Sequence, residues 1–171
     1  LAGVLNLRIV NEFAICLTST ETDDTQRIHC LKLDGDDITS ASDWHLAKRF
    51  VTPGTKDTDS IAWAIDATVL DDTDASGRMW LIWSGWPSVN NQNLYLAELA
   101  TPTSFVANAS RVLLSKPTES WELLNRKVNE GPVVLRHGNA THVVYSCNGC
   151  ASDYYSLALL TCTNGNYGAA S

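Results

Sequence analysis

Met79-Trp-Leu-Ile-Trp-Ser84 is the stretch that decides the fold, because it is an apolar run that ends in a small hydroxyl residue and has copies elsewhere in the chain. Phe13-Ala-Ile-Cys-Leu-Thr18 has the same pattern 66 residues earlier. The runs that follow keep this offset, since Gln26–Leu31 is matched by Gln92–Ala97. Short runs rich in β-branched and aromatic residues indicate strands. The chain therefore repeats a unit made of strands.

A third copy of the unit follows the first two. It consists of His142–Ser146 and Tyr155–Leu160, with a slightly shorter spacing. Two further runs, Trp44–Lys48 and Ser110–Leu114, are expected to form short outer strands of the first and second units. Four short strands per unit, at a period of roughly 40 to 65 residues, are typical of a β-propeller. We expect an all-β chain with little helix.

Two carboxylates lie in matching apolar frames at the start of successive units. Asp66 lies in Trp63-Ala-Ile-Asp-Ala-Thr-Val-Leu70, and Glu130 lies in Val128-Asn-Glu-Gly-Pro-Val-Val134. Their offset of 64 predicts that both occupy the same point of successive first strands and face the central channel, whereas the first unit has no carboxylate at the matching position near Val4. A buried charge is costly unless it is paired or used. Paired carboxylates are the working groups of glycoside hydrolysis.

Composition and charge narrow the class of protein. The chain has 171 residues, 44% of them hydrophobic and 18% charged, which indicates one globular domain over residues 1–171. Its 12 Lys and Arg against 19 Asp and Glu give a net charge of −7, which argues against nucleic acid and against an anionic membrane as partners. No apolar run approaches the roughly 18 residues of a membrane span.

The cysteines and histidines do not predict a metal site or a cofactor. Cys147-Asn-Gly-Cys150 is a CxxC pair, but no second CxxC follows, as a structural zinc site would require. The four histidines lack the spacing of metal ligands. The odd number of cysteines, five, leaves at least one of them unpaired.

Several motifs together resemble glycoside hydrolase family 43, and within it the arabinofuranosidase-like members. The resemblance covers most of the chain from about Asn11 onward. The stretches that carry it are Trp63–Asp66, Met79–Trp86, Gln92–Glu98, Val128–Val133, Val144–Gly149 and Asp153–Leu160.

The resemblance implies a five-bladed propeller of inverting enzymes, of which this chain supplies about two and a half blades. It implies that Glu130 is the general acid and that Asp66 orients this acid and modulates its pKa. The family's general base, an Asp, lies on the preceding blade, and no residue here matches it. The fifth-blade stretch with its metal-associated His also has no match. Leu1-Ala-Gly-Val-Leu-Asn-Leu7 departs from the Trp-Ala-Pro-Glu-Leu-His that the family often has.

The resemblance further implies an extracellular protein that acts on arabinose-containing plant polysaccharide or oligosaccharide. A signal peptide is not visible in this chain, but the glycosylation sequons at Asn108 and Asn139 favour secretion. Aromatic rings near the acids are candidates for stacking on sugars, so Trp86 and Trp63 are predicted to bind substrate. Asn129, beside Glu130, is predicted to hydrogen-bond a sugar hydroxyl.

Two alternatives remain open at this point. One is a non-catalytic carbohydrate-binding or degenerate propeller that lacks the general base. The other is a propeller that binds proteins, in which Asp66 and Glu130 serve only as structural acids.

Overall fold

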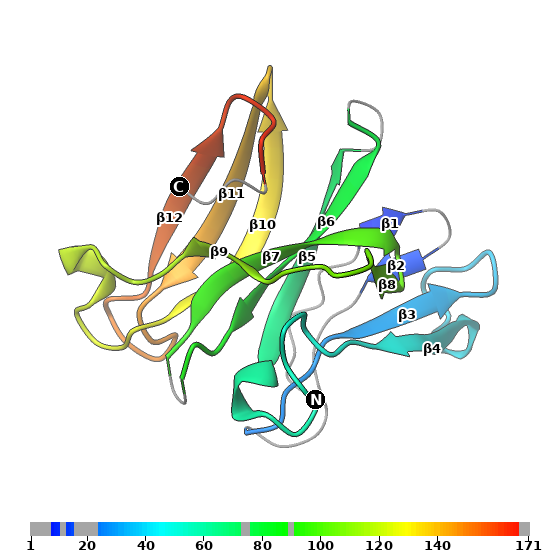
Figure 1. The fold of residues 1–171 in the computed structure, drawn as a ribbon, viewed down its shortest axis with the longest axis horizontal. Coiled ribbons are helices and arrows are strands. Elements are labelled where there is room, and N and C mark those ends of the chain that lie inside the picture. The colour runs from blue at the N-terminus through cyan, green and yellow to red at the C-terminus, as the bar shows by residue number, and fades with distance from the viewer. Residues whose placement is uncertain (1–7, 11–12, 16–23, 73–75, 89–90, 168–171) are drawn as a thin grey trace.

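The computed structural model describes residues 24–72, 76–88 and 91–167, together with the backbone of residues 8–10 and 13–15. This part of the chain is all-β, as predicted, with twelve strands and three single-turn 3-10 helices (Figure 1). The strands are β1 (Arg8–Val10), β2 (Phe13–Ile15), β3 (His29–Leu33), β4 (Trp44–Arg49), β5 (Ala64–Asp72), β6 (Arg78–Gly85), β7 (Asn93–Thr101), β8 (Ser104–Phe105), β9 (Val112–Ser115), β10 (Asn129–His137), β11 (Ala140–Cys147) and β12 (Ser156–Cys162). The helices are η1 (Ala41–Asp43), η2 (Ser60–Ala62) and η3 (Ser120–Glu122).

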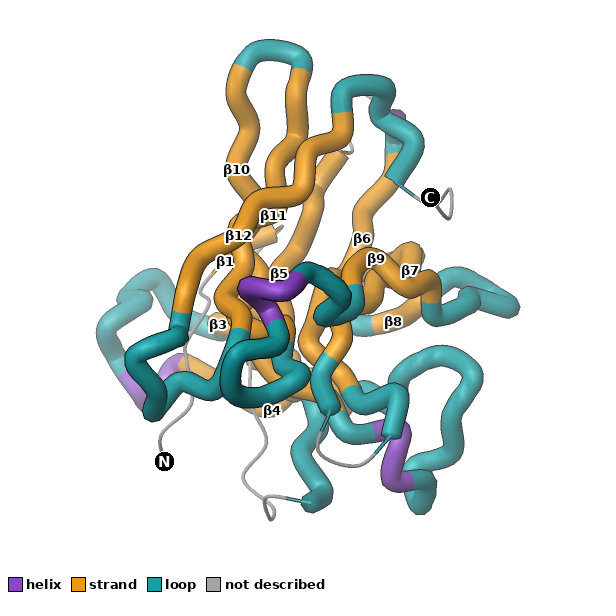
Figure 2. The backbone as a smooth tube through the Cα atoms, turned by 90° about the vertical axis from the view of Figure 1, so that its left-hand side faces the viewer, coloured by secondary structure: helices purple, strands orange, loops and turns teal. Residues whose placement is uncertain are grey.

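The strands form three antiparallel sheets that follow the chain order. The first sheet has the order β1-β2-β3-β4, the second β5-β6-β7-β8 with β9 also paired to β7, and the third β10-β11-β12. The longer loops lie mainly at one end of the strands (Figure 2). The three sheets do not close into a ring within the described residues.

The repeat seen in the sequence is confirmed by these sheets. The predicted outer strands are present as β4 and as β9, which begins at Val112 rather than Ser110. The predicted first-unit counterpart near Val4 lies outside the described residues, as do residues 16–18 of the Phe13 run.

The deciding stretch of sequence is apolar throughout because β6 is covered on both faces. Leu81 and Trp83 belong to a cluster that joins the second sheet to Ile28 and Phe50 of the first-sheet region. Trp80 and Ile82 face the other way, toward Val134 and Val143 of the third sheet. A strand with two buried faces needs no polar alternation. This central position of β6 explains why Met79–Ser84 is the clearest strand signal in the sequence.

The third sheet has one apolar face that the described residues leave uncovered. Val133, Leu135, Leu157 and Leu159 are all exposed, Leu157 to 73%. Val133 pairs with Val144, which pairs with Leu159, so these side chains share one face of the sheet. A contiguous exposed apolar patch of this kind marks a surface that packs against another element or partner.

Polar contacts fix the first strand of the third sheet against the second sheet. Gln92 N–H donates to the Lys127 carbonyl at 2.9 Å, and Asn129 N–H donates to the Gln92 carbonyl at 3.0 Å. The Ser84 hydroxyl donates to the Asn129 carbonyl at 2.9 Å. At the far end of the strands, Arg136 forms an ion pair with Asp72 at 2.6 Å. The relative position of β5 and β10 is therefore set at both ends.

Replacing Leu81 by Ala tests the central place of β6 in the packing. Leu81 is fully buried, so the substitution leaves a cavity and should lower the free energy of unfolding by about 2 to 5 kcal/mol. Leu46→Ala, on the exposed side of β4, is the matched control and should change it by less than about 0.5 kcal/mol. Chemical denaturation measures both, and equal effects would show that β6 is not central to the core.

Candidate active site

The two predicted acids lie at β-bulges in the first strands of neighbouring sheets. The β5–β6 register shifts between Ile65 and Thr68, and the β10–β11 register shifts between Glu130 and Val133. Each bulge contains a residue with a left-handed backbone, Asp66 with φ of 53° and Gly131 with φ of 60°. A bulge re-aims side chains at the edge of a sheet and is common beside active sites. Each of the two bulges therefore places a residue with a left-handed backbone at or next to one of the predicted acids.

The prediction that the two acids occupy the same point of successive strands is wrong by one residue. Ile65 pairs with Ser84, and Glu130 pairs with Ser146, so the structural equivalent of Asp66 is Gly131. Both strands carry a bulge at this point, and a bulge interrupts the two-residue alternation by which side chains point to one face or the other, so spacing along the chain does not fix the point of the strand that each acid occupies.

A hydrogen bond joins the two bulges directly. The N–H of Gly131 donates to Asp66 Oδ2 at 3.1 Å, and Glu130 is the residue immediately before this donor. The structure thus places the carboxylate of Asp66 next to the segment that carries Glu130. The expectation that both acids belong to one polar site agrees with this geometry.

Burial raises the pKa of both acids, and a neighbouring charge raises that of Glu130 further. The pKa of Glu130 is raised to about 6, first by burial and then by the negative charge of Asp66, while a hydrogen bond from the Tyr155 hydroxyl opposes the shift. Burial also raises the pKa of Asp66, opposed by the Gly131 N–H. A carboxyl with a pKa near 6 is protonated in part at mildly acidic pH, so Glu130 is able to donate a proton there.

Trp63 and Trp86 cover each other instead of presenting open faces. Their ring centroids are 4.7 Å apart with an interplanar angle of 11°, and their exposed fractions are only 5% and 4%. They flank the paired residues Ala64 and Gly85, at the same end of β5 and β6 as Asp66. Neither ring has a free face on which a sugar stacks, so this pair supports the strand ends beside Asp66.

Asn129 points into the protein rather than toward a sugar. Its side chain is fully buried, and its amide donates to Ser115 Oγ at 3.1 Å and to Glu122 Oε1 at 3.2 Å. The predicted contact with a sugar hydroxyl does not fit this placement. Alternation along β10 explains the difference, because Asn129 and Glu130 are neighbours in a strand and point to opposite sides.

Glu122 is a buried carboxylate that the sequence analysis did not single out. Its Oε2 accepts from the N–H groups of Thr118 at 2.8 Å and Glu119 at 3.0 Å, and its Oε1 accepts from the Tyr145 hydroxyl at 2.8 Å and from Asn129. Burial alone would raise its pKa, but these donors outweigh burial and lower it. The signal in the sequence was a capping box whose first residue is Glu119 in place of the usual Ser or Thr.

Asn148 ties together the two loops that surround the start of β10. Its Oδ1 accepts from the N–H groups of Leu124 at 3.0 Å and Asn125 at 3.2 Å. Its Nδ2 donates to the carbonyls of Trp121 at 2.8 Å and Tyr154 at 3.1 Å. Asn tolerates the left-handed backbone found here, with φ of 66°. The loop before β10 and the loop before β12 are therefore one connected unit (Figure 1).

The described residues contain neither a cluster of metal ligands nor a membrane-spanning helix. No group of three or more His, Cys, Asp or Glu side chains there could hold a metal ion. No helix in those ranges has the length and apolar character that a membrane span requires. Cys147, Cys150 and Cys162 are free thiols. An apolar cavity of about 360 Å³ between the second and third sheets is lined by Leu70, Leu96 and Val143, not by the two acids.

Comparison with known proteins decides the family. The sequence pattern of the family described as glycosyl hydrolases family 43 matches residues 8–166, which is nearly the whole chain. The chain belongs to glycosyl hydrolases family 43. This confirms the resemblance that the motifs indicated.

Curated proteins that are similar to this chain are named as arabinofuranosidases. The chain is 36% identical over 102 residues to alpha-L-arabinofuranosidase 43 of Humicola insolens, which is 57% of this chain and 20% of that protein. It is 37% identical over 65 residues to the extracellular exo-alpha-(1->5)-L-arabinofuranosidase of Streptomyces avermitilis, which is 38% of this chain and 13% of that protein. The chain thus spans less than a third of the length of these relatives.

Solved structures show the same fold. The alpha-L-arabinofuranosidase of Lactobacillus brevis superposes with a TM-score of 0.67 at 29% identity, over 84% of this chain and 42% of that one. The alpha-L-arabinanase of Cellvibrio cellulosa superposes with a TM-score of 0.68 at 16% identity, over 94% of this chain and 52% of that one. The three sheets are therefore a family 43 arrangement that covers about half of such a protein.

Gly131→Ala tests the left-handed bulge that holds Asp66. An Ala at this φ should lower the free energy of unfolding by about 1 to 2 kcal/mol. This cost comes from the backbone conformation and not from a steric clash, because the new Cβ would meet only Ser146 Oγ at 3.9 Å. Displacing the Gly131 N–H should also raise the pKa of Asp66, because that bond lowers it.

Gly138→Ala is the matched control for this prediction. Gly138 has φ of 57° with nothing near the added Cβ, so the backbone cost is similar, but it lies in the β10–β11 turn away from Asp66. Carboxyl NMR titration should therefore show an unchanged Asp66 pKa. A Gly131→Ala protein with wild-type stability would contradict the bulge geometry.

Proposed function

We propose that this protein is an inverting glycoside hydrolase that cleaves arabinose-containing plant polysaccharide, with Glu130 as its general acid. The observation that carries the proposal is the half-buried Glu130, whose pKa is raised to about 6 beside the charge of Asp66, in a family 43 chain. The arabinofuranosidase names of the relatives support arabinose as the sugar.

In the proposed reaction, the proton of Glu130 passes to the leaving oxygen as the bond between that oxygen and the anomeric carbon breaks. A water oxygen bonds to the same carbon from the opposite face and gives its proton to a second carboxylate, which inverts the configuration. We assign this base to neither Asp66 nor Glu130. By resemblance it is a further Asp that no residue of this chain matches, so hydrolysis requires it from outside residues 1–171.

We assign Asp66 the role of modulating and orienting the acid. Its negative charge favours the protonated form of Glu130, because two like charges at close range disfavour each other. The Gly131 N–H holds the Asp66 carboxylate in place through the backbone that carries Glu130.

The finer description of the fold is part of the proposal. We take the three sheets as successive blades of a five-bladed catalytic propeller, to which residues 1–171 contribute a part. The uncovered apolar face at Val133, Leu135, Leu157 and Leu159 supports this, since a further blade would bury it.

We further propose that the protein is secreted and that a polysaccharide or oligosaccharide is its partner. Relatives that are named extracellular support secretion. Asn108 and Asn139, the Asn residues of both sequons, are exposed and lie in turns, where a glycan can be attached. The alternative of a non-catalytic carbohydrate-binding propeller is not favoured, because the raised pKa of Glu130 is the property that a proton donor needs.

Glu130→Gln tests the assignment of the general acid in the full-length gene product. Glutamine keeps the size of the side chain but has no acidic proton, so kcat/KM for arabino-oligosaccharides should fall by about 10² to 10⁴. An aryl arabinoside whose leaving group needs little protonation should retain far more activity. Glu98→Gln, at an ion pair with Arg78 on β7, is the control and should leave both rates unchanged. Near-normal hydrolysis of the oligosaccharide by Glu130→Gln would remove Glu130 from this role.

Asp66→Asn tests the electrostatic coupling through pH dependence. Activity requires protonated Glu130, so the wild-type rate should decline as the pH rises through about 6. Removing the charge of Asp66 should lower the pKa of Glu130 and move this alkaline limb to lower pH. The pH profile of kcat/KM measures the shift, with exposed Asp36→Asn as the control. An unmoved limb, or one moved to higher pH, would refute the coupling.

A further inference from the structure

Tyr155 is the aromatic residue that touches the proposed acid. Its hydroxyl lies within reach of the Glu130 carboxyl and of Ser146, which is the cross-strand partner of Glu130. Tyr155 lies directly before β12, and its N–H donates to the Ser152 carbonyl at 3.1 Å. Its side chain is nevertheless 42% exposed. The hydroxyl of Tyr155 is therefore placed at Glu130, while part of the side chain is accessible to a ligand.

We propose that Tyr155, together with Tyr154 and Trp121, forms the binding wall for the saccharide on the leaving-group side of the scissile bond. This inference rests on the proposed function, in which Glu130 gives its proton to the leaving oxygen. The sugar that departs with that oxygen must then lie against the Glu130 carboxyl. Tyr155, which is 42% exposed, lies beside this carboxyl, so the departing sugar contacts its ring.

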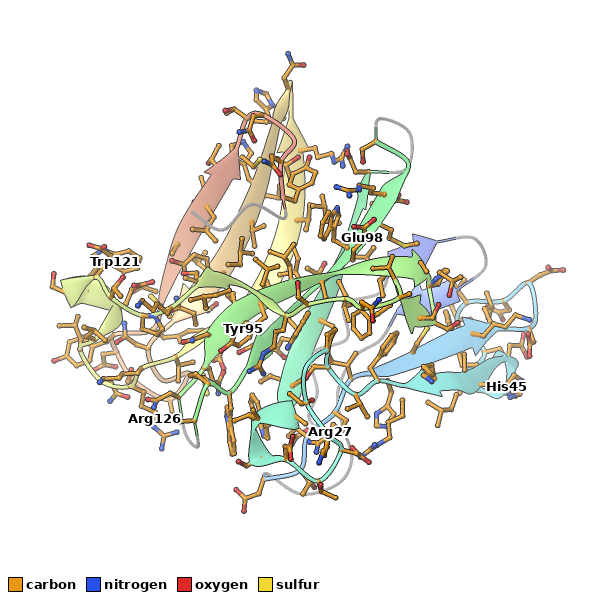
Figure 3. All side chains as sticks on the ribbon, in the orientation of Figure 1. Arg27, His45, Tyr95, Glu98, Trp121 and Arg126 are labelled. Atoms are coloured by element: carbon orange, nitrogen blue, oxygen red, sulfur yellow. The ribbon has the colours of Figure 1, made fainter. Side chains whose placement is uncertain are left out.

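Trp121 and Tyr154 extend this surface on two loops that one buried side chain holds together. The Nδ2 of Asn148 donates to the carbonyls of both residues, so their backbones lie side by side. Both side chains are exposed, Trp121 to 42%. Figure 3 shows Trp121 at the edge of the molecule on the loop that leads to β10. Two large aromatic side chains exposed on neighbouring loops are an unusual feature for a surface that only meets water.

The loops are rigid in a way that suits recognition. Asn148 is fully buried and uses its amide for four hydrogen bonds to the two loops. Glu122, beside Trp121, accepts four further hydrogen bonds and anchors the η3 turn. Aromatic side chains on a preorganised backbone bind at a lower entropic cost. They supply a flat apolar surface with a polar tip, which matches a sugar ring that has one apolar face and several hydroxyls.

Trp121→Ala and Tyr154→Ala test the wall through substrates that differ only on the leaving-group side. In the full-length gene product, each substitution should raise KM for arabinotriose by about three- to tenfold, the change expected from losing one aromatic contact. Kinetics with a methyl arabinofuranoside, whose leaving group is too small to reach these rings, should stay unchanged. Equal losses for both substrates, or no loss for arabinotriose, would overturn the proposal.

Tyr155→Phe separates a positioning effect on Glu130 from a merely structural one. Loss of the hydroxyl should move the alkaline limb of the pH profile to higher pH, because its hydrogen bond lowers the pKa of Glu130. Tyr167→Phe is the matched control, since that hydroxyl bonds to Thr141 at 2.9 Å in another part of the third sheet. A limb that stays in place, or that moves equally in both variants, would overturn the role of Tyr155.

Failure of the proposed function gives a different result. A wild-type protein that hydrolyses neither substrate refutes hydrolysis, and calorimetric titration with arabinotriose then tests the wall alone. Binding by the wild type that Trp121→Ala weakens supports the wall as a saccharide site, whereas absent or equal binding refutes it.

Discussion

The hydrogen bond from the Gly131 N–H to the Asp66 carboxylate is the contact on which the candidate site depends. It requires a left-handed residue on each of two neighbouring strands, and each left-handed residue requires a bulge in an otherwise regular antiparallel pair. Because the bond runs from backbone to side chain across two sheets, it relates the position of Glu130 to the position of Asp66. The packing of β5 beside β10 and the polar contacts around Gln92 serve to keep the two bulges in register.

Two glutamates close to each other in sequence, the buried Glu122 and the half-buried Glu130, show how the surroundings decide the chemistry of a carboxyl. Glu122 accepts four hydrogen bonds, and these donors hold its pKa below the ordinary value in spite of burial. Glu130 receives one opposing hydrogen bond from Tyr155 and faces the charge of Asp66, so its pKa rises to about 6. Hydrogen bonds to the charged carboxylate lower its pKa and so offset the effect of desolvation. Where few such hydrogen bonds are present, desolvation dominates and the pKa rises. One residue is thus a structural anion, and the other is the proposed proton donor.

Most of the strand order was predictable from the sequence, whereas the positions of the bulges and the neighbours of the aromatic rings at the site were not. The runs around Met79–Ser84 read clearly as strands because β6 is buried on both faces. The prediction that Asp66 and Glu130 occupy the same point of successive strands was wrong by one residue, because the sequence of so short a strand does not reveal a bulge. Trp63 and Trp86 were expected to face a sugar, but the structure stacks them on each other. Spacing along the chain does not reveal which neighbour an aromatic ring will find.

The sequence by itself determined the all-β repeat, the family and the two acids, because these depend on the pattern of residue types along the chain. The tertiary structure decided which groups surround each acid. It turned Asn129 inward to Glu122 and brought Tyr155, which is 25 positions from Glu130, to that carboxyl. It also joined the loops of Trp121 and Tyr154 through Asn148. Burial, charge proximity and hydrogen bonding act through space, and residues distant in sequence supply them, so only the folded chain defines the chemistry of the site.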